Sequence, residues 1–183
     1  MTPTGRKLTP RRVPKLPARK RPYKTVALGG TFDFFHKGHE QLLSAAFKLS
    51  ESVIIGITSD LFVKTLGKTH RVESYSTRVR SVRQFLSKRR WNQRGEIHRL
   101  DDPLGPAGTR ESLEAVIVTL DTLSSGRKLN HTRRASGLAI VEIRSVPFAI
   151  AEDGKPISST RIRKGEIDRR GRTLHTSRPR ALS

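Results

Sequence analysis

The sequence predicts an α/β fold built on a parallel sheet with helices on both faces, and two observations carry this prediction. Apolar runs of strand length alternate along the chain with longer segments in which apolar residues recur at a helical period. The first two runs are continuously apolar, which is typical of strands buried on both faces of a parallel sheet. Ligands of such sheets bind at the carboxyl ends of the strands, so a functional site is expected there.

A β-α-β unit is expected at the start of this alternating region. Its strands are predicted over residues 25–28, where the apolar run meets Gly29-Gly30, and over residues 53–57. Between them, a helical period of apolar residues predicts a helix over residues 39–49. The later elements, in chain order, are a basic amphipathic helix over 77–90, strands over 96–100 and 115–118, a helix over 122–134, a strand over 138–146 and a short helix over 158–163.

Much of the positive charge lies at the two ends of the chain. The 183 residues carry a formal net charge of +21, from 37 Lys and Arg against 16 Asp and Glu. Residues 1–22 and 169–183 hold 13 of these basic residues and no acidic one. Residues 23–168 therefore carry a formal net charge of +8. We therefore predict one catalytic domain over residues 23–168 and two flexible basic tails. Prolines in the first tail oppose a regular helix, and this tail either tethers RNA or another polyanion or is dispensable.

The composition excludes several kinds of site. The chain has no cysteine, so a disulfide framework, a thiolate nucleophile and a cysteine-ligated zinc site are ruled out. A zinc site made from the six His and distant carboxylates is not expected, and we predict no resident metal. No apolar stretch is long enough to span a bilayer, and the first residues lack the apolar block of a secretory signal. We expect a cytoplasmic protein without membrane contacts, and its oligomeric state stays open.

The segment from Gly29 to His39, GGTFDFFHKGH, carries the strongest chemical signal. It lies where the first strand ends and the first helix begins, so its glycines and the helix N-terminus can present backbone N–H groups to phosphate oxygens. His36 and His39 share one face of the helix start, and Gly38 leaves space between them. Two imidazoles here suit the charge that develops on a phosphate during in-line displacement. A purely local role, in which the pair satisfies nearby backbone groups, is the alternative.

The segment from Ile157 to Arg163, ISSTRIR, is a second candidate phosphate site. Three hydroxyl residues open the predicted short helix, and Arg161 or Arg163 could stabilise a leaving pyrophosphate. A capped surface helix requires one hydroxyl, but not three followed by alternating arginines. Together the two segments predict transfer of a nucleotidyl group between phosphate substrates, and both must then open onto a single cleft.

These two segments resemble the paired signatures of the HxGH nucleotidyltransferase superfamily, and residues 24–171 resemble the archaeal and eukaryotic type of phosphopantetheine adenylyltransferase. The resemblance implies a Rossmann-like fold of the nucleotidyltransferase type. It also implies that ATP and 4′-phosphopantetheine give dephospho-coenzyme A and pyrophosphate, with Mg²⁺ entering with ATP. Further matching pieces are Thr58-Ser59-Asp60, Arg78, Asp102 to Ala107, Ala151 to Gly154 and Arg163 to Asp168.

The resemblance implies a role for individual residues. The catalytic residues would be His36, His39, Lys64 and Arg161, with His39 stabilising the transition state. The residues that bind ATP would be Gly29, Gly30, Thr31, Phe32, His36, Gly38, His39, Thr119, Ser158, Ser159, Thr160 and Arg161. The residues that bind the acceptor would be Thr31, Asp33, Lys64, Lys68 and Arg78. This chain departs from the usual pattern at Phe34, where proline or leucine is common, and over residues 119–122, where Thr-Leu-Asp-Thr replaces Ser-x-Glu-Thr.

Other functions stay open. A cytidylyltransferase, or an adenylyltransferase acting on glycerol phosphate, nicotinamide mononucleotide or flavin mononucleotide, would use the same chemistry. The ISSTRIR segment and the Gly30 to Phe34 segment both differ from the patterns usual in those enzymes. An RNA-binding protein is the alternative from another class. Aromatic residues make up only 5% of the chain and no RNA-reading motif is visible, so nucleic acid is expected to bind only through the basic tails.

Overall fold

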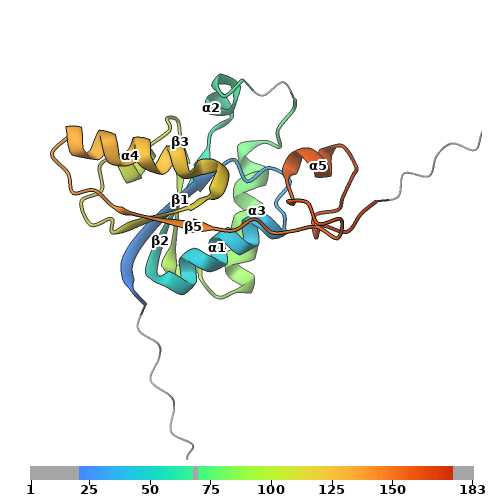
Figure 1. Ribbon diagram of the computed structural model, residues 1–183, viewed down its shortest axis with the longest axis horizontal. Coiled ribbons are helices and arrows are strands. Elements are labelled where there is room, and N and C mark those ends of the chain that lie inside the picture. The colour runs from blue at the N-terminus through green and yellow to red at the C-terminus, as the bar shows by residue number, and fades with distance from the viewer. Residues whose placement is uncertain (1–20, 68–69, 175–183) are drawn as a thin grey trace, which may run out of the picture.

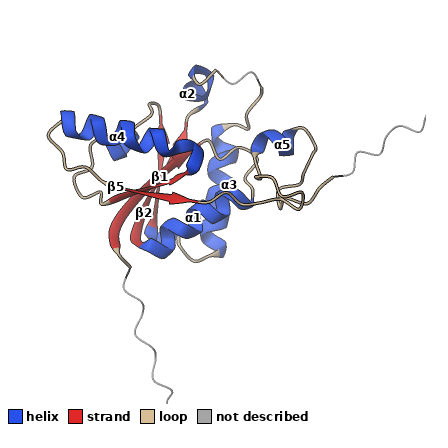
Figure 2. Cartoon of the chain, viewed as in Figure 1, coloured by secondary structure: helices blue, strands red, loops and turns tan. Residues whose placement is uncertain are grey.

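The computed structural model describes residues 21–67 and 70–174, which form a five-stranded parallel sheet with helices on both faces (Figures 1 and 2). The predicted fold class is confirmed. The strands are β1 (Tyr23–Gly30), β2 (Ser50–Thr58), β3 (Gly95–Leu100), β4 (Ala115–Thr119) and β5 (Glu142–Val146), and their order in the sheet is β3-β2-β1-β4-β5. The α-helices are α1 (Lys37–Leu49), α2 (Asp60–Thr65), α3 (Tyr75–Lys88), α4 (Leu123–Ala135) and α5 (Ser159–Arg163). The strand order reverses between β1 and β4, which is where ligands bind in open sheets of this type.

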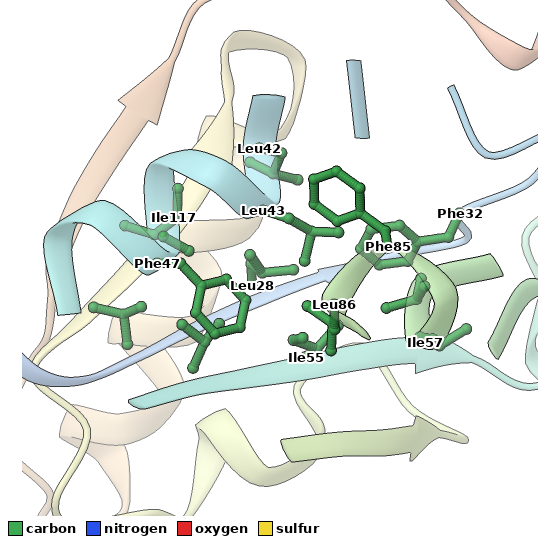
Figure 3. Packing of buried hydrophobic residues seen from close by; sticks show 14 of the residues in the cluster. Leu28, Phe32, Leu42, Leu43, Phe47, Ile55, Ile57, Phe85, Leu86 and Ile117 are labelled. Atoms are coloured by element: carbon green, nitrogen blue, oxygen red, sulfur yellow. The ribbon is translucent and has the colours of Figure 1, made fainter. Parts of the chain in front are cut away.

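Side-chain alternation along the strands divides the apolar residues between two cores. Leu28 of β1 and Ile55 of β2 face α1 and α3 and are fully or almost fully buried against Phe47 and Leu86 (Figure 3). On the opposite face, Ala27, Ile54 and Val116 are buried together with Leu129 of α4. Because burial of apolar surface is the main favourable term in folding, these two cores hold the helices against the sheet and fix the positions of the loops between them.

The predicted strand over residues 138–146 is wrong in its first four residues, which form a loop after the C-terminal cap of α4. Gly137 has a φ of +74°. The Leu138 N–H donates to the Arg133 carbonyl at 2.9 Å and the Gly137 N–H to the Arg134 carbonyl at 3.1 Å, the pattern of a Schellman cap. The chain then turns back along the helix, and β5 begins only at Glu142.

Helix α2 was not predicted from the sequence. It has six residues and buries only Val63, so it leaves no detectable helical period. Its start is defined by Ser59, whose Oγ accepts a hydrogen bond from the Phe62 N–H at 3.0 Å.

The folded domain extends beyond the predicted boundary at residue 168. The Glu152 N–H donates to the Gly171 carbonyl at 2.9 Å, and Ile167 and Thr173 form a β-bridge. Gly171 is buried with a φ of +88°, and a Cβ on it would lie 2.5 Å from the Ile157 side chain. Residues 169–174 are therefore packed against the second signature segment and are not a tail. Most of the predicted N-terminal tail and residues 175–183 lie outside the described residues. None of the helices in the described ranges is long and apolar enough to cross a bilayer.

Candidate active site

A cleft of about 790 Å³ opens at the carboxyl ends of β1 and β4. The first signature segment contributes Gly29, Gly30, Thr31, Phe32, Asp33, His36, Gly38 and His39 to its wall. The second contributes Ile157, Ser158 and Ser159, and the end of β4 contributes Thr119 and Asp121. The two segments, more than a hundred residues apart in the chain, thus meet at one cleft, as the prediction of an active site required.

The histidine pair forms a reciprocal cap at the start of α1. The Nδ1 atom of His36 accepts a hydrogen bond from the Gly38 N–H at 3.1 Å, and the Nδ1 atom of His39 accepts one from the His36 N–H at 3.3 Å. The two rings stack with centroids 3.8 Å apart. A Cβ on Gly38 would lie 3.0 Å from the His36 ring, so a side chain here would require that ring to move.

This cap determines which ring nitrogens carry protons. An Nδ1 atom that accepts a hydrogen bond is unprotonated, so each neutral ring carries its proton on Nε2. Burial, together with the positive charge of Arg169, lowers the pKa of His36 to about 4, and the negative charge of Asp33 opposes this shift. His36 is therefore neutral near pH 7. The Nδ1 atoms of the pair do satisfy nearby backbone N–H groups, which was the alternative role considered for these residues. This bonding leaves the Nε2 atoms as the hydrogen-bond donors.

The first N–H groups of α1 are already bonded within the protein. The Lys37 N–H donates to the Arg169 carbonyl at 3.0 Å, and the Gly38 N–H is held by His36. The expectation that this helix start presents unpaired N–H groups to phosphate is therefore wrong for these two positions. The imidazoles and the nearby hydroxyl groups are the donors that the segment can offer.

A buried ion pair ties the two signature segments together. The Asp33 side chain is only 3% exposed, and its Oδ2 atom pairs with Nη2 of Arg163. The other carboxylate oxygen accepts the Glu73 N–H at 2.9 Å. The Ser159 hydroxyl donates to the Asp33 carbonyl at 2.6 Å. Asp33, predicted to bind the acceptor, thus lies at the cleft but has its carboxylate committed to this pair.

The segment after α5 adds a second tie to the same turn. Glu73 accepts the Phe34 N–H at 3.0 Å and pairs with Nη2 of Arg169 at 3.2 Å. The guanidinium groups of Arg163 and Arg169 each lie over the Phe34 ring, at 5.3 and 5.6 Å from its centroid. Phe34 has a φ of +45°, which is costly for an aromatic residue, so these contacts stabilise a strained turn. The unusual phenylalanine thus holds the turn through its ring.

Arg78, also predicted to bind the acceptor, is instead completely buried. One guanidinium nitrogen donates to the carbonyls of Thr31 at 2.9 Å and Thr58 at 2.7 Å, and the others reach the Glu73 carbonyl at 2.8 Å and the Asp60 carboxylate at 2.8 Å. Arg78 therefore joins the ends of β1 and β2 to the start of α3. It does not line the cleft in the described structure.

Three more predicted residues lie away from the cleft wall. Arg161 pairs with Asp153 at 2.5 Å and Glu166 at 2.9 Å, and so braces the loops around α5.

Thr160 and Lys64 are exposed and do not line the cleft, although Phe62 and Leu66 beside Lys64 do. Lys68 lies outside the described residues. At the end of β4, the Thr119 hydroxyl donates to the Asp121 carboxylate, and both residues line the cleft.

A family model described as cytidylyltransferase-like matches residues 27–165 of the chain. The chain belongs to this family. Curated relatives carry a narrower name: the phosphopantetheine adenylyltransferase of Methanothermobacter thermautotrophicus is 43% identical over 155 residues, covering 85% of this chain and 92% of the relative. The phosphopantetheine adenylyltransferase of Methanosarcina barkeri is 44% identical over 150 residues, covering 80% of this chain and 91% of the relative.

Solved structures agree with the fold of the cytidylyltransferase-like family. A protein of unknown function from Archaeoglobus fulgidus is 28% identical, with a TM-score of 0.60 over 68% of this chain and 99% of that one. A bifunctional NMN adenylyltransferase/ADP ribose pyrophosphatase from Francisella tularensis is 18% identical, with a TM-score of 0.53 over 78% of this chain and 41% of that one. At that identity, the second comparison bears on the fold alone.

Sequence reasoning did not place Glu73 and Arg169 at the site. Arg169 was assigned to a basic tail, and it lies beyond the span matched by the cytidylyltransferase-like model. The Asp-x-x-Gly pattern from Asp168 to Gly171 could have predicted an ordered turn at this point of the chain. The Asp168 carboxylate accepts the N–H groups of Arg170 and Arg172, and hydrogen bonds from Arg172 chiefly lower the pKa of this carboxylate to about 2. Such a turn is a structured element rather than part of a tail.

Arg78→Ala should destabilise the fold rather than weaken acceptor binding. We expect the free energy of unfolding to fall by about 3 kcal/mol, because buried carbonyl groups and Asp60 lose their partner. Arg80→Ala, an exposed change on the same helix, should alter it by less than about 0.5 kcal/mol. Chemical denaturation measures both. A small effect of Arg78→Ala on stability together with a raised KM for the acceptor would restore the role first implied for this residue.

His36 should stay neutral well below pH 6. Because its folded-state pKa is lowered below the unfolded value of 6.5 to about 4, the unfolded chain binds the proton first. This contribution to stability is complete above pH 6.5 and is lost as the pH falls towards 4. NMR of ¹³C-labelled histidine should show an inflection for His36 near pH 4, and Arg169→Gln should move it upward. An inflection near 6.5 in the unmodified protein would contradict this assignment.

Proposed function

We infer that this protein transfers the adenylyl group of ATP to 4′-phosphopantetheine, giving dephospho-coenzyme A and pyrophosphate, and that it acts in the cytoplasm. The observation that carries this inference is the meeting of the two signature segments at one cleft, in a chain that is 43–44% identical to archaeal phosphopantetheine adenylyltransferases. The cleft lies at the reversal of strand order, where a nucleotide is expected to bind in this class of sheet.

The reaction is an in-line displacement at the α-phosphorus of ATP. A phosphate oxygen of 4′-phosphopantetheine forms the new P–O bond while the bond to the β-phosphate breaks, and the electron pair leaves with pyrophosphate. The acceptor phosphate is already an anion, so it needs positioning more than deprotonation. No covalent intermediate with the protein is required.

The histidine pair supplies charge stabilisation. Both rings can donate from Nε2 because their Nδ1 atoms are held by backbone N–H groups. We assign His39 to the oxygens of the α-phosphate, where charge develops in the transition state, and His36 to the triphosphate beside it. Because His36 is neutral near pH 7, its Nε2 atom can donate to the triphosphate without a prior proton transfer.

The Ser158 hydroxyl completes the proposed triphosphate site, because its oxygen accepts the Arg161 N–H and its proton can still be donated, whereas the Ser159 hydroxyl donates to the Asp33 carbonyl. Ser158 and Ser159 line the cleft, and the Ile157 carbonyl just before them would lie 3.7 Å from a Cβ on Gly38 of the first segment. Thr31 is assigned to the acceptor phosphate and Thr119 to the nucleoside. Arg161 is assigned only a supporting role, because its guanidinium is engaged with Asp153 and Glu166.

Magnesium is assigned to the substrate as Mg·ATP. The described residues contain no cluster of three or more His, Asp or Glu side chains that could hold a metal. Mg²⁺ commonly keeps several waters and is bound mostly by substrate phosphates, so such a cluster is not needed. Two carboxylates of the described residues line the cleft: Asp33, which is held in the buried ion pair with Arg163, and Asp121, which lies outside that pair.

A substrate panel tests this proposal. Purified protein should release pyrophosphate from Mg·ATP with 4′-phosphopantetheine and form dephospho-coenzyme A, and should be at least about 10²-fold less active with CTP. Nicotinamide mononucleotide, flavin mononucleotide and glycerol phosphate serve as competing acceptors. His39→Ala should lower kcat by about 10² or more, while His131→Ala, an exposed change on α4, should not. Turnover confined to CTP or to another acceptor would contradict the proposal.

A further inference from the structure

The exposed cations of α3 form no ion pair with a carboxylate, although eight arginines of the described residues do. Among the described residues, ion pairs engage Arg78, Arg99, Arg110, Arg144, Arg161, Arg163, Arg169 and Arg172. Arg80, Arg83 and Lys88 on the outer side of α3, and Arg89 and Arg90 just after it, are exposed and form none within the described ranges. The exposed cations of α4 form none with described residues either, so α3 is set apart by the cationic residues that continue its surface. No acidic residue occurs between Glu73 and Glu96.

This arrangement is unfavourable for the isolated helix. Arg80 and Arg83 are three residues apart on one helix face, where like charges repel each other. The core needs only the other face of α3, whose Val79, Val82, Phe85 and Leu86 are buried. The outer cations are therefore not explained by folding, and they are not explained by the cleft, because no residue of α3 lines it in the described structure.

The cationic surface continues past the end of α3 towards the N-terminus of the described chain. Arg94 donates to the carbonyls of Phe47 and Ser50, and its pKa is lowered by burial and then by the nearby positive charge of Arg21. Ser50 pairs with Tyr23 in the sheet, so Arg21, two residues before Tyr23, lies near Arg94 at the end of the sheet where β1 and β2 begin. Residues 1–20 add seven further basic residues and no acidic one to the chain that enters here.

We propose that the outer surface of α3, formed by Arg80, Arg83, Lys88 and Arg90 and continued by Arg94 and Arg21, binds the phosphate backbone of a nucleic acid without reading its base sequence. Planar guanidinium groups match phosphate oxygens, and neutralising a polyanion releases its counterions. From the sequence alone, nucleic acid was expected to bind only through the basic tails. The proposal adds the folded surface of α3 to these binding segments.

Backbone binding fits this surface better than base stacking or membrane binding. Trp91 stacks on Phe47 with centroids 4.5 Å apart and lies under Arg89, so it is not an open platform for bases. None of the exposed large apolar side chains of the described structure lies on α3. Amphipathic helices that lie in a membrane interface present apolar side chains to the lipid, and the outer side of α3 presents charge.

The chain offers a matched control on the other face of the sheet. The variant Arg80→Gln, Arg83→Gln, Lys88→Gln removes three charges from α3, and Arg127→Gln, Lys128→Gln, Arg134→Gln removes three exposed charges from α4. Both keep helix-forming residues and the same net charge. Binding of a labelled RNA of about 20 nucleotides, and of DNA with the same sequence, is followed by fluorescence anisotropy from about 50 to 200 mM salt on the full-length protein.

The α3 variant should bind both nucleic acids at least about tenfold more weakly, and the slope of log Kd against log salt should fall by about 2 to 3. The α4 variant should change Kd less than about threefold, and turnover of the α3 variant should stay within about twofold of the original protein. Equal weakening by both variants, weakening by neither, dependence on base sequence, or preferential binding to vesicles of anionic lipid would each overturn the proposal. Failure of the proposed enzyme activity would leave these binding results unchanged, so the two proposals are tested separately.

Discussion

The ion pair between Asp33 and Arg163 is the interaction on which the candidate active site depends. Asp33 lies in the turn after β1, and Arg163 lies at the end of α5, so the pair joins the two signature segments directly. A buried carboxylate is costly unless it is paired and hydrogen-bonded, and Asp33 meets this condition with Arg163 and the Glu73 N–H. Removing either partner would leave the other charge uncompensated. The pair is therefore a strong constraint on how closely the segments approach.

The chemistry of the site follows from this constraint. The turn from Thr31 to His36 contains two non-glycine residues with positive φ, Phe32 at +57° and Phe34 at +45°. Such a turn persists only when surrounding contacts determine it, and these contacts come from Arg163, Arg169 and the Glu73 carboxylate. With the turn fixed, the histidines cap α1 and direct their protonated nitrogens away from the backbone. Donors that are positioned before the substrate binds need no reorganisation during the reaction.

The sequence predicted the parallel sheet and the meeting of the two signature segments because both depend on patterns that are local in the chain. Continuous apolar runs marked β1 and β2, and glycines and hydroxyls marked the turns where phosphates bind. The same patterns do not say whether a charged side chain is buried. Arg78, Asp33 and Arg161 were predicted to contact substrates, yet each is engaged with partners that only the tertiary structure brings near. Lys64 lies in α2, which has only six residues and therefore no detectable period, and Arg169 was assigned to a tail because a charged C-terminal run resembles one.

A double-mutant cycle on kcat tests most directly whether the Asp33–Arg163 pair holds the two segments at one cleft. Asp33→Asn, Arg163→Gln and the double variant are compared with the original protein, after circular dichroism confirms that each is folded. Each single change should lower kcat by about 10²-fold, because small displacements of positioned groups are costly, and the double variant should lose no more than the worse single variant. Losses that simply multiply in the double variant would show that the two residues act independently and would contradict this account.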